Sequence, residues 1–142
     1  MARIDDYLIT LVEHGGSDLH LCVGLPPKIR IHGRLEPLDD APIDEETMVA
    51  LLGEICPEEK WQHYLSHLDL DFAYELKGCA RFRTNYMHNH FGHGAVLRVI
   101  PTKILTFEQL GLTDVLKEVC HYTRGLVLVT GQIGRASGRE RV

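Results

Sequence analysis

Asp69-Leu-Asp-Phe-Ala-Tyr-Glu-Leu76 is the first of three stretches that decide the fold of this 142-residue chain. Arg81-Phe-Arg-Thr-Asn-Tyr86 and Ala95-Val-Leu-Arg-Val-Ile100 are the other two, and in each of them every second side chain is apolar. This period of two is typical of a strand with one buried face. Because the links between them are short, we expect an antiparallel meander, which Pro101 ends.

In the residues before this meander, the apolar period changes from 3.6 to 2 and back to 3.6. Apolar spacing predicts a helix over residues 4–12, and helices that begin at Asp44, as an N-cap, and at Pro57. Short strands are expected between the first two helices, over residues 18–23, 28–32 and 34–38. After Pro101, Thr106 and Thr113 are typical caps of short helices. The whole pattern indicates an α+β fold with an antiparallel sheet and flanking helices.

Composition narrows the classes of function. The net charge of −5 argues against nucleic acid as a partner, because phosphate backbones attract positive surfaces. The longest apolar run is far below the roughly 20 residues that span a bilayer, which predicts no membrane insertion. Asp5 and Asp6 stand where a signal peptide needs basic residues, so we expect a cytoplasmic protein. The four cysteines are widely spaced, and we expect free thiols.

Charge is distributed unevenly along the chain. Residues 36–59 carry nine carboxylates and no lysine or arginine, and they favour a solvated helical surface. Residues 79–107 carry no carboxylate, and their basic residues are Arg81, Arg83, Arg98 and Lys103.

The arginines are the first candidate site. If the hairpin turns between His90 and Phe91, Arg83 lies opposite Arg98, with Arg81 on the same face. Like charges directly opposite one another are unfavourable, so an anion such as phosphate is expected to compensate them. The alternative is a set of surface salt bridges with Asp69, Asp71 and Glu75 of the preceding strand.

The histidines are the second candidate. His88, His90 and His93 surround one loop, which we expect to hold Gly92 and Gly94. Imidazole is a common metal ligand, yet no Asp, Glu or Cys lies nearby in sequence to complete a ligand set. We therefore favour a solvated loop without a metal, and a metal site stays open as the alternative.

The end of the chain resembles the start of a phosphate-binding loop. The apolar run 125–129 leads into Thr130-Gly131, as a buried strand leads into a P-loop. Counted from Gly131, the P-loop pattern requires Gly, Lys and Ser/Thr where this chain has Ala136, Ser137 and Gly138. The lysine is missing, so we expect no ATP hydrolysis by this chain alone.

Several stretches together resemble one family. They are Gly16-Ser-Asp-Leu-His-Leu21, Pro27-Lys-Ile-Arg-Ile-His-Gly33, Asp69-Leu-Asp-Phe-Ala-Tyr-Glu75, Arg81-Phe-Arg-Thr-Asn85, Arg98-Val-Ile-Pro101, Leu110-Gly-Leu112 and Arg124-Gly-Leu-Val-Leu-Val-Thr-Gly131. Residues 1–131 resemble the N-terminal part of the type IV pilus retraction ATPase, the twitching-motility member of the secretion ATPases.

The resemblance implies a PAS-like N-terminal domain over residues 1–120, a linker over 121–125 and a RecA-like ATPase domain from 126. It implies a hexameric ring at the pilus base, peripheral to the inner membrane and in contact with its platform protein. The complete family protein would use ATP and Mg²⁺, and the isolated fragment would hold neither. Arg83 and Arg98, with Arg81 beside them, match positions that clamp the phosphates of a neighbouring subunit's nucleotide.

The resemblance fails after residue 131. Of the family's loop only Thr130, Gly131 and Gly134 fit, and residues 132–142 form a polar tail without apolar periodicity. We therefore expect that tail to be foreign or frame-shifted sequence, with a natural variant lacking the motor as the alternative. A second hypothesis for the whole chain is a free-standing PAS-like module. Such a module would bury a small ligand or bind a partner through residues 36–59.

Overall fold

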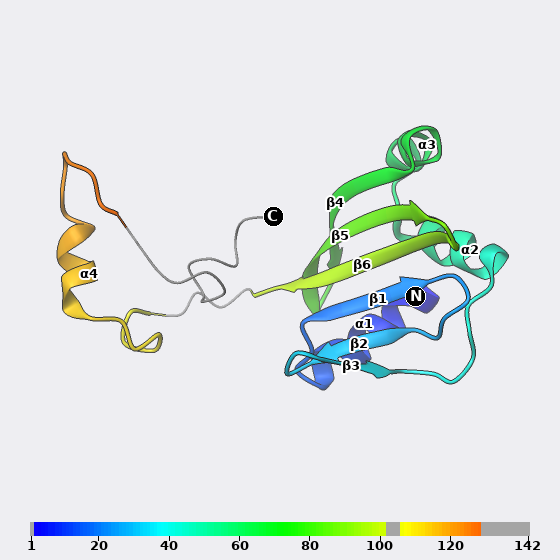
Figure 1. Cartoon of the computed structure of the whole chain (residues 1–142), viewed down its shortest axis with the longest axis horizontal. Coiled ribbons are helices and arrows are strands. Elements are labelled where there is room, and N and C mark those ends of the chain that lie inside the picture. The colour runs from blue at the N-terminus through cyan, green and yellow to red at the C-terminus, as the bar shows by residue number, and fades with distance from the viewer. Residues whose placement is uncertain (1, 102–105, 129–142) are drawn as a thin grey trace. The chain divides into compact units, whose positions relative to one another are not determined.

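A six-stranded antiparallel sheet forms the centre of residues 1–102 (Figure 1). The computed structural model describes residues 2–101 and 106–128 of the chain. The strand order in the sheet is β3-β2-β1-β6-β5-β4. The strands are β1 (Asp18–Cys22), β2 (Lys28–Ile31), β3 (Arg34–Pro37), β4 (Asp69–Leu76), β5 (Ala80–Asn89) and β6 (Gly92–Ile100). The α+β class and the antiparallel meander that the alternation predicted are therefore confirmed.

Three helices accompany this sheet, namely α1 (Arg3–Glu13), α2 (Glu45–Ile55) and α3 (Glu58–His67). Asp44 caps α2 as predicted, because its carboxylate accepts a 2.7 Å hydrogen bond from the backbone N–H of Thr47. Pro57 is the N-cap of α3 and not its first helical residue, so the prediction was one residue early. No helix in the described part of the chain is both long and apolar enough to cross a membrane.

The predicted pairing of the last hairpin is confirmed. Arg83 pairs with Arg98 and His88 pairs with His93, which is the register that a turn between His90 and Phe91 requires. The expected loop around Gly92 and Gly94 was wrong, because β6 already begins at Gly92 and only His90 and Phe91 form the turn. A positive φ of 123° at Gly92 lets the strand begin directly after so short a turn.

The two faces of the sheet differ in chemistry. The face toward the helices is apolar, and Phe82, Tyr86 and Leu97 on it are fully buried. Leu8 of α1 and Leu52 of α2 are equally inaccessible and belong to the same core. Because side chains alternate along a strand, the residues between these core positions lie on the opposite face, where the arginines are exposed.

The second unit, Lys103–Val142, is described over residues 106–128. It contains the helix α4 (Asp114–Val119), whose N-cap is Thr113 as predicted, and a single turn after Thr106. Residues 125–128 form no strand in the described part of the chain, although a strand was predicted there. A strand requires a hydrogen-bonding neighbour, and Leu126 and Leu128 are instead 82% and 75% exposed. All four cysteines are free thiols, as expected.

Candidate functional site

Four side chains form one row across the exposed face of the sheet. In the strand register, Arg30 of β2 pairs with Asp18 of β1, Asp18 with Arg98 of β6, and Arg98 with Arg83 of β5. Partners in an antiparallel pair point to the same face. We call Arg30, Asp18, Arg98 and Arg83 the arginine row; it carries three positive charges and one negative charge.

Asp18 is the anchor of the arginine row. Its carboxylate is almost completely buried, and it accepts hydrogen bonds of 2.7 Å each from Nε of Arg98 and from Oγ of Ser17. Nε of Arg30 lies 3.4 Å from Oδ2 of Asp18, the oxygen that also accepts the bond from Ser17. Burial alone would raise the pKa of Asp18, but the bonds from Arg98 and Ser17 lower it below 3.8, so the group is ionised at neutral pH.

Arg83 has a separate partner. Its Nε and Nη2 bond to the carboxylate of Asp71 on β4, and this pair raises the pKa of Arg83 further. The surface salt bridge considered from the sequence therefore forms at Arg83. Both members are exposed, at 66% and 42% of their side chains, so solvent screens the pair.

Arg81, the third arginine predicted for this site, is exposed on β5. It lies opposite Glu75 of β4 and Ile100 of β6 in the strand register. It shares the face of the arginine row because it is two residues from Arg83. The three predicted arginines are thus on one face. The predicted loop residues Thr130, Gly131 and Gly134 lie outside the described residues.

Sequence reasoning missed the pairing of Arg98 with Asp18. The two residues are 80 positions apart, and they meet because β1 lies beside β6 in the sheet. The only signal was the stretch 16–21, in which the polar Asp18 precedes alternating apolar residues.

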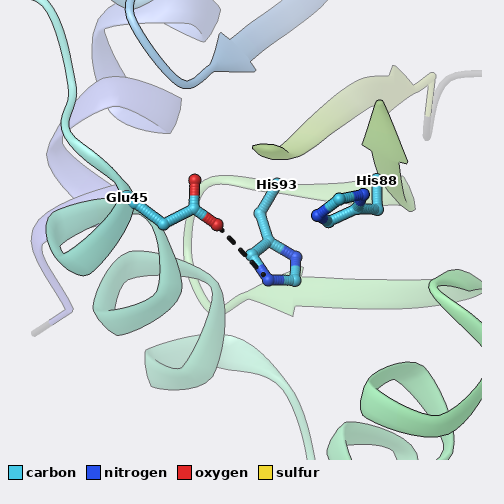
Figure 2. Close-up of side chains that lie close together, drawn as sticks. All are labelled: Glu45, His88 and His93. Atoms are coloured by element: carbon cyan, nitrogen blue, oxygen red, sulfur yellow. Dashed lines mark ion pairs between the residues drawn. The ribbon is translucent and has the colours of Figure 1, made fainter. Parts of the chain in front are cut away.

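The histidines are brought together differently from the prediction. His88 and His93 are strand partners with ring centroids 4.8 Å apart, and Glu45 at the start of α2 completes a group with them (Figure 2). One ligand atom from each of the three residues lies within 4.8 Å of the others. His90 is in the turn and is not part of this group. We call Glu45, His88 and His93 the histidine–glutamate cluster.

His93 is the least exposed member of the cluster. Its Nδ1 lies 2.6 Å from the hydroxyl of Tyr64, and its Nε2 lies 3.5 Å from Oε1 of Glu45. Burial lowers the pKa of His93 below 6.5 despite the opposing charge of Glu45. Burial also raises the pKa of Tyr64 to about 12, so the phenol keeps its hydrogen at neutral pH.

Known proteins resemble most of this chain. The type IV pilus retraction ATPase PilT of Pseudomonas aeruginosa is 41% identical over 131 residues, which are 92% of this chain and 38% of PilT. The type IV pilus ATPase PilU of the same organism is 35% identical over 93% of this chain and 35% of its own length. The chain thus spans less than half the length of these relatives. No family model matches it.

A solved structure agrees with the sequence relatives. The crystal structure of the pilus retraction motor PilT with bound ADP superimposes with a TM-score of 0.76 at 34% identity, over 94% of this chain and 39% of that one. The resemblance inferred from the motifs is therefore confirmed. Over most of its length the chain is thus similar to the N-terminal part of the PilT-type pilus retraction ATPases.

Proposed function

We propose that this chain supplies Arg83 and Arg98, with Arg81 beside them, to the phosphates of a nucleotide held by the ATPase domain of a neighbouring subunit. The observation that carries the proposal is the direct pairing of Arg83 with Arg98 on the exposed face of the sheet. Two guanidinium groups at such a pairing repel each other, and an anion between them relieves the repulsion.

The bonds of the two arginines leave donors for that anion. Arg98 uses Nε for Asp18, so the four hydrogens of its two Nη atoms lie outside this bond. Arg83 uses Nε and Nη2 for Asp71, which leaves its Nη1. Asp18 would position Arg98, whereas the exposed Asp71 would be exchanged for phosphate oxygens. Such charge neutralisation is the main contribution of arginines to phosphoryl transfer.

The complete protein would act as a motor on this basis. We propose that it forms a hexameric ring on the cytoplasmic side of the inner membrane, in contact with the platform protein of the pilus base. It would bind ATP and Mg²⁺ and use hydrolysis to retract the pilus. The bound ADP of the PilT crystal structure supports a nucleotide as the ligand. Thr130, Gly131 and Gly134 would begin the nucleotide loop.

The experiment is a titration of Mg·ATP into three samples: this chain, a PilT-type ATPase domain without its own N-terminal domain, and their mixture. We expect binding to be tightest in the mixture. Removing a charged hydrogen bond weakens binding by about 10-fold or more, so Arg83→Ala and Arg98→Ala should each do so. Arg34→Ala is the matched control, because Arg34 is an exposed arginine on β3, which is three strands away from β6 and four from β5 in the strand order.

If the mixtures that contain Arg83→Ala or Arg98→Ala bind Mg·ATP as tightly as the mixture with the unchanged chain, the proposed clamp is overturned. In that case a free-standing interaction module that uses the acidic residues 36–59 becomes the better function. A small ligand between the sheet and the helices has less support, because that space holds the fully buried Leu52, Tyr86 and Leu97.

A further inference from the structure

The histidine–glutamate cluster lies on the other face of the sheet from the arginine row. His88 and Arg83 are an odd number of residues apart on β5, so their side chains point to opposite faces. His88 and His93 continue the buried face beyond Tyr86 toward the first residue of α2. The cluster is thus spatially separate from the arginine row.

The hydrogen-bond partners of Tyr64 define the state of His93. The single hydrogen of the phenol is directed to the carbonyl oxygen of Met87, which is 3.1 Å away and only accepts. The phenol oxygen then accepts a hydrogen bond from Nδ1–H of His93 at 2.6 Å. This tautomer leaves Nε2 of His93 with a lone pair, and that atom faces Glu45 (Figure 2).

A lone pair and a carboxylate that face each other at 3.5 Å need a positive species between them. His88 brings another imidazole to the same point, and its side chain is exposed. Two imidazoles and one carboxylate are a common ligand set for a divalent transition metal. The phenol behind His93 is the kind of outer partner that fixes the tautomer of a metal-binding histidine.

We propose that Glu45, His88 and His93 bind one zinc ion, which joins the start of α2 to the β5–β6 hairpin. In tetrahedral zinc sites with bonds of about 2.0–2.1 Å, donor atoms are roughly 3.3 Å apart. Glu45 and His93 are already at 3.5 Å, and all three donors lie within 4.8 Å, so a rotation of the exposed His88 completes the geometry. Water takes the fourth position.

The backbone at Gly92 makes room for this arrangement. A Cβ atom on Gly92 would overlap the carboxylate of Glu45, so the absence of a side chain there lets Glu45 lie against the hairpin. The positive φ of Gly92 also excludes most other residues.

The test uses the full 142-residue chain, stripped of metal with a chelator and titrated with ZnCl₂. We expect one zinc ion per chain by calorimetry and a rise in the melting temperature, because a ligand that binds only the folded state stabilises it. Glu45→Gln and His88→Gln should each weaken zinc binding at least about 10-fold, and Tyr64→Phe should weaken it through the lost support of His93. Glu45 and His88 are exposed, so we expect the variants Glu45→Gln and His88→Gln to fold.

Two controls separate this site from other zinc ligands. His90→Gln changes the adjacent turn histidine, and His67→Gln removes one of the two stacked histidines of α3, whose ring centroids are 4.1 Å apart. Both variants should bind zinc as the unchanged chain does. Loss of the zinc response in His67→Gln, or its full retention in Glu45→Gln and His88→Gln, would overturn the proposal. So would a thiolate charge-transfer band after Co²⁺ replaces zinc, because it would assign the metal to a cysteine.

Discussion

Arg83 and Arg98 face each other directly across β5 and β6, yet each guanidinium is bonded to a carboxylate from a different strand. The partner of Arg98 is the buried Asp18 of β1, and the partner of Arg83 is the exposed Asp71 of β4. This difference in burial supports the proposal that Asp18 positions Arg98, whereas a ligand could displace Asp71 from Arg83.

Asp18→Asn should lower the free energy of unfolding by about 1–3 kcal/mol, because a neutral amide replaces the buried carboxylate that accepts the charged hydrogen bond of Arg98. Urea unfolding followed by circular dichroism measures the change. Asp71→Asn is the matched control, and it should cost less than about 1 kcal/mol because the Arg83–Asp71 pair is exposed. Similar losses in the two variants would contradict the assignment of Asp18 as the anchor.

The free energy of unfolding should depend on pH through the protonation of Asp18. Its pKa is lowered in the folded state, so the unfolded chain binds the proton more readily. This contribution to stability is complete above about pH 4 and is lost as pH falls through the lower folded pKa. Unfolding experiments between about pH 2.5 and 6 should therefore show a steeper acid loss for the unchanged chain than for Asp18→Asn. Parallel curves would contradict this prediction.

Tyr86→Phe should lower the free energy of unfolding by about 1–2 kcal/mol. The buried hydroxyl of Tyr86 donates a 2.8 Å hydrogen bond to the carbonyl oxygen of Leu52, and this bond connects β5 to α2. Tyr7→Phe is the control, since the Tyr7 hydroxyl makes no hydrogen bond within residues 2–101 and 106–128, and its loss should be near zero. Denaturant unfolding measures both. Equal values would show that the Tyr86 bond adds no stability.

Gly92→Ala should destabilise the fold more than Gly78→Ala. Both glycines have positive φ, but the 123° of Gly92 lies far from the left-handed region of about 57° that other residues can reach, whereas the 80° of Gly78 lies closer to it. We expect a difference of about 1 kcal/mol or more in thermal or urea unfolding. Gly92→Ala should also weaken zinc binding by moving Glu45, whereas Gly78→Ala should leave it unchanged.

The hairpin could be predicted because the sequence pattern that determines it lies within the hairpin itself. Alternation in residues 81–86 and 95–100, with one short turn between them, fixes which residues are partners, so the Arg83–Arg98 pairing followed without a structure. The position of the turn was predicted correctly. The predicted loop was too long, because glycine occurs both in loops and at the distorted start of a strand. Gly92 is the first residue of the strand β6 and not part of a loop.

The parts of both sites that were missed depend on distant contacts. Glu45 joins His88 and His93 only because α2 begins beside the end of the last hairpin, which no spacing in the sequence reveals. Asp18 meets Arg98 because β1 is inserted next to β6 rather than next to β4. Local patterns identify elements and their faces, whereas the order of strands is set by packing of the whole domain.

The adjacency of β1 and β6 has a consequence for biosynthesis. Within the sheet, the strands β3-β2-β1 are hydrogen-bonded to the strands β6-β5-β4 through the pairing of β1 with β6. Asp18 leaves the ribosome about 80 residues before its partner Arg98, so the N-terminal half must wait with an unpaired inner edge. We therefore expect productive folding of the nascent chain to require protection of the β1 edge until β6 has been translated.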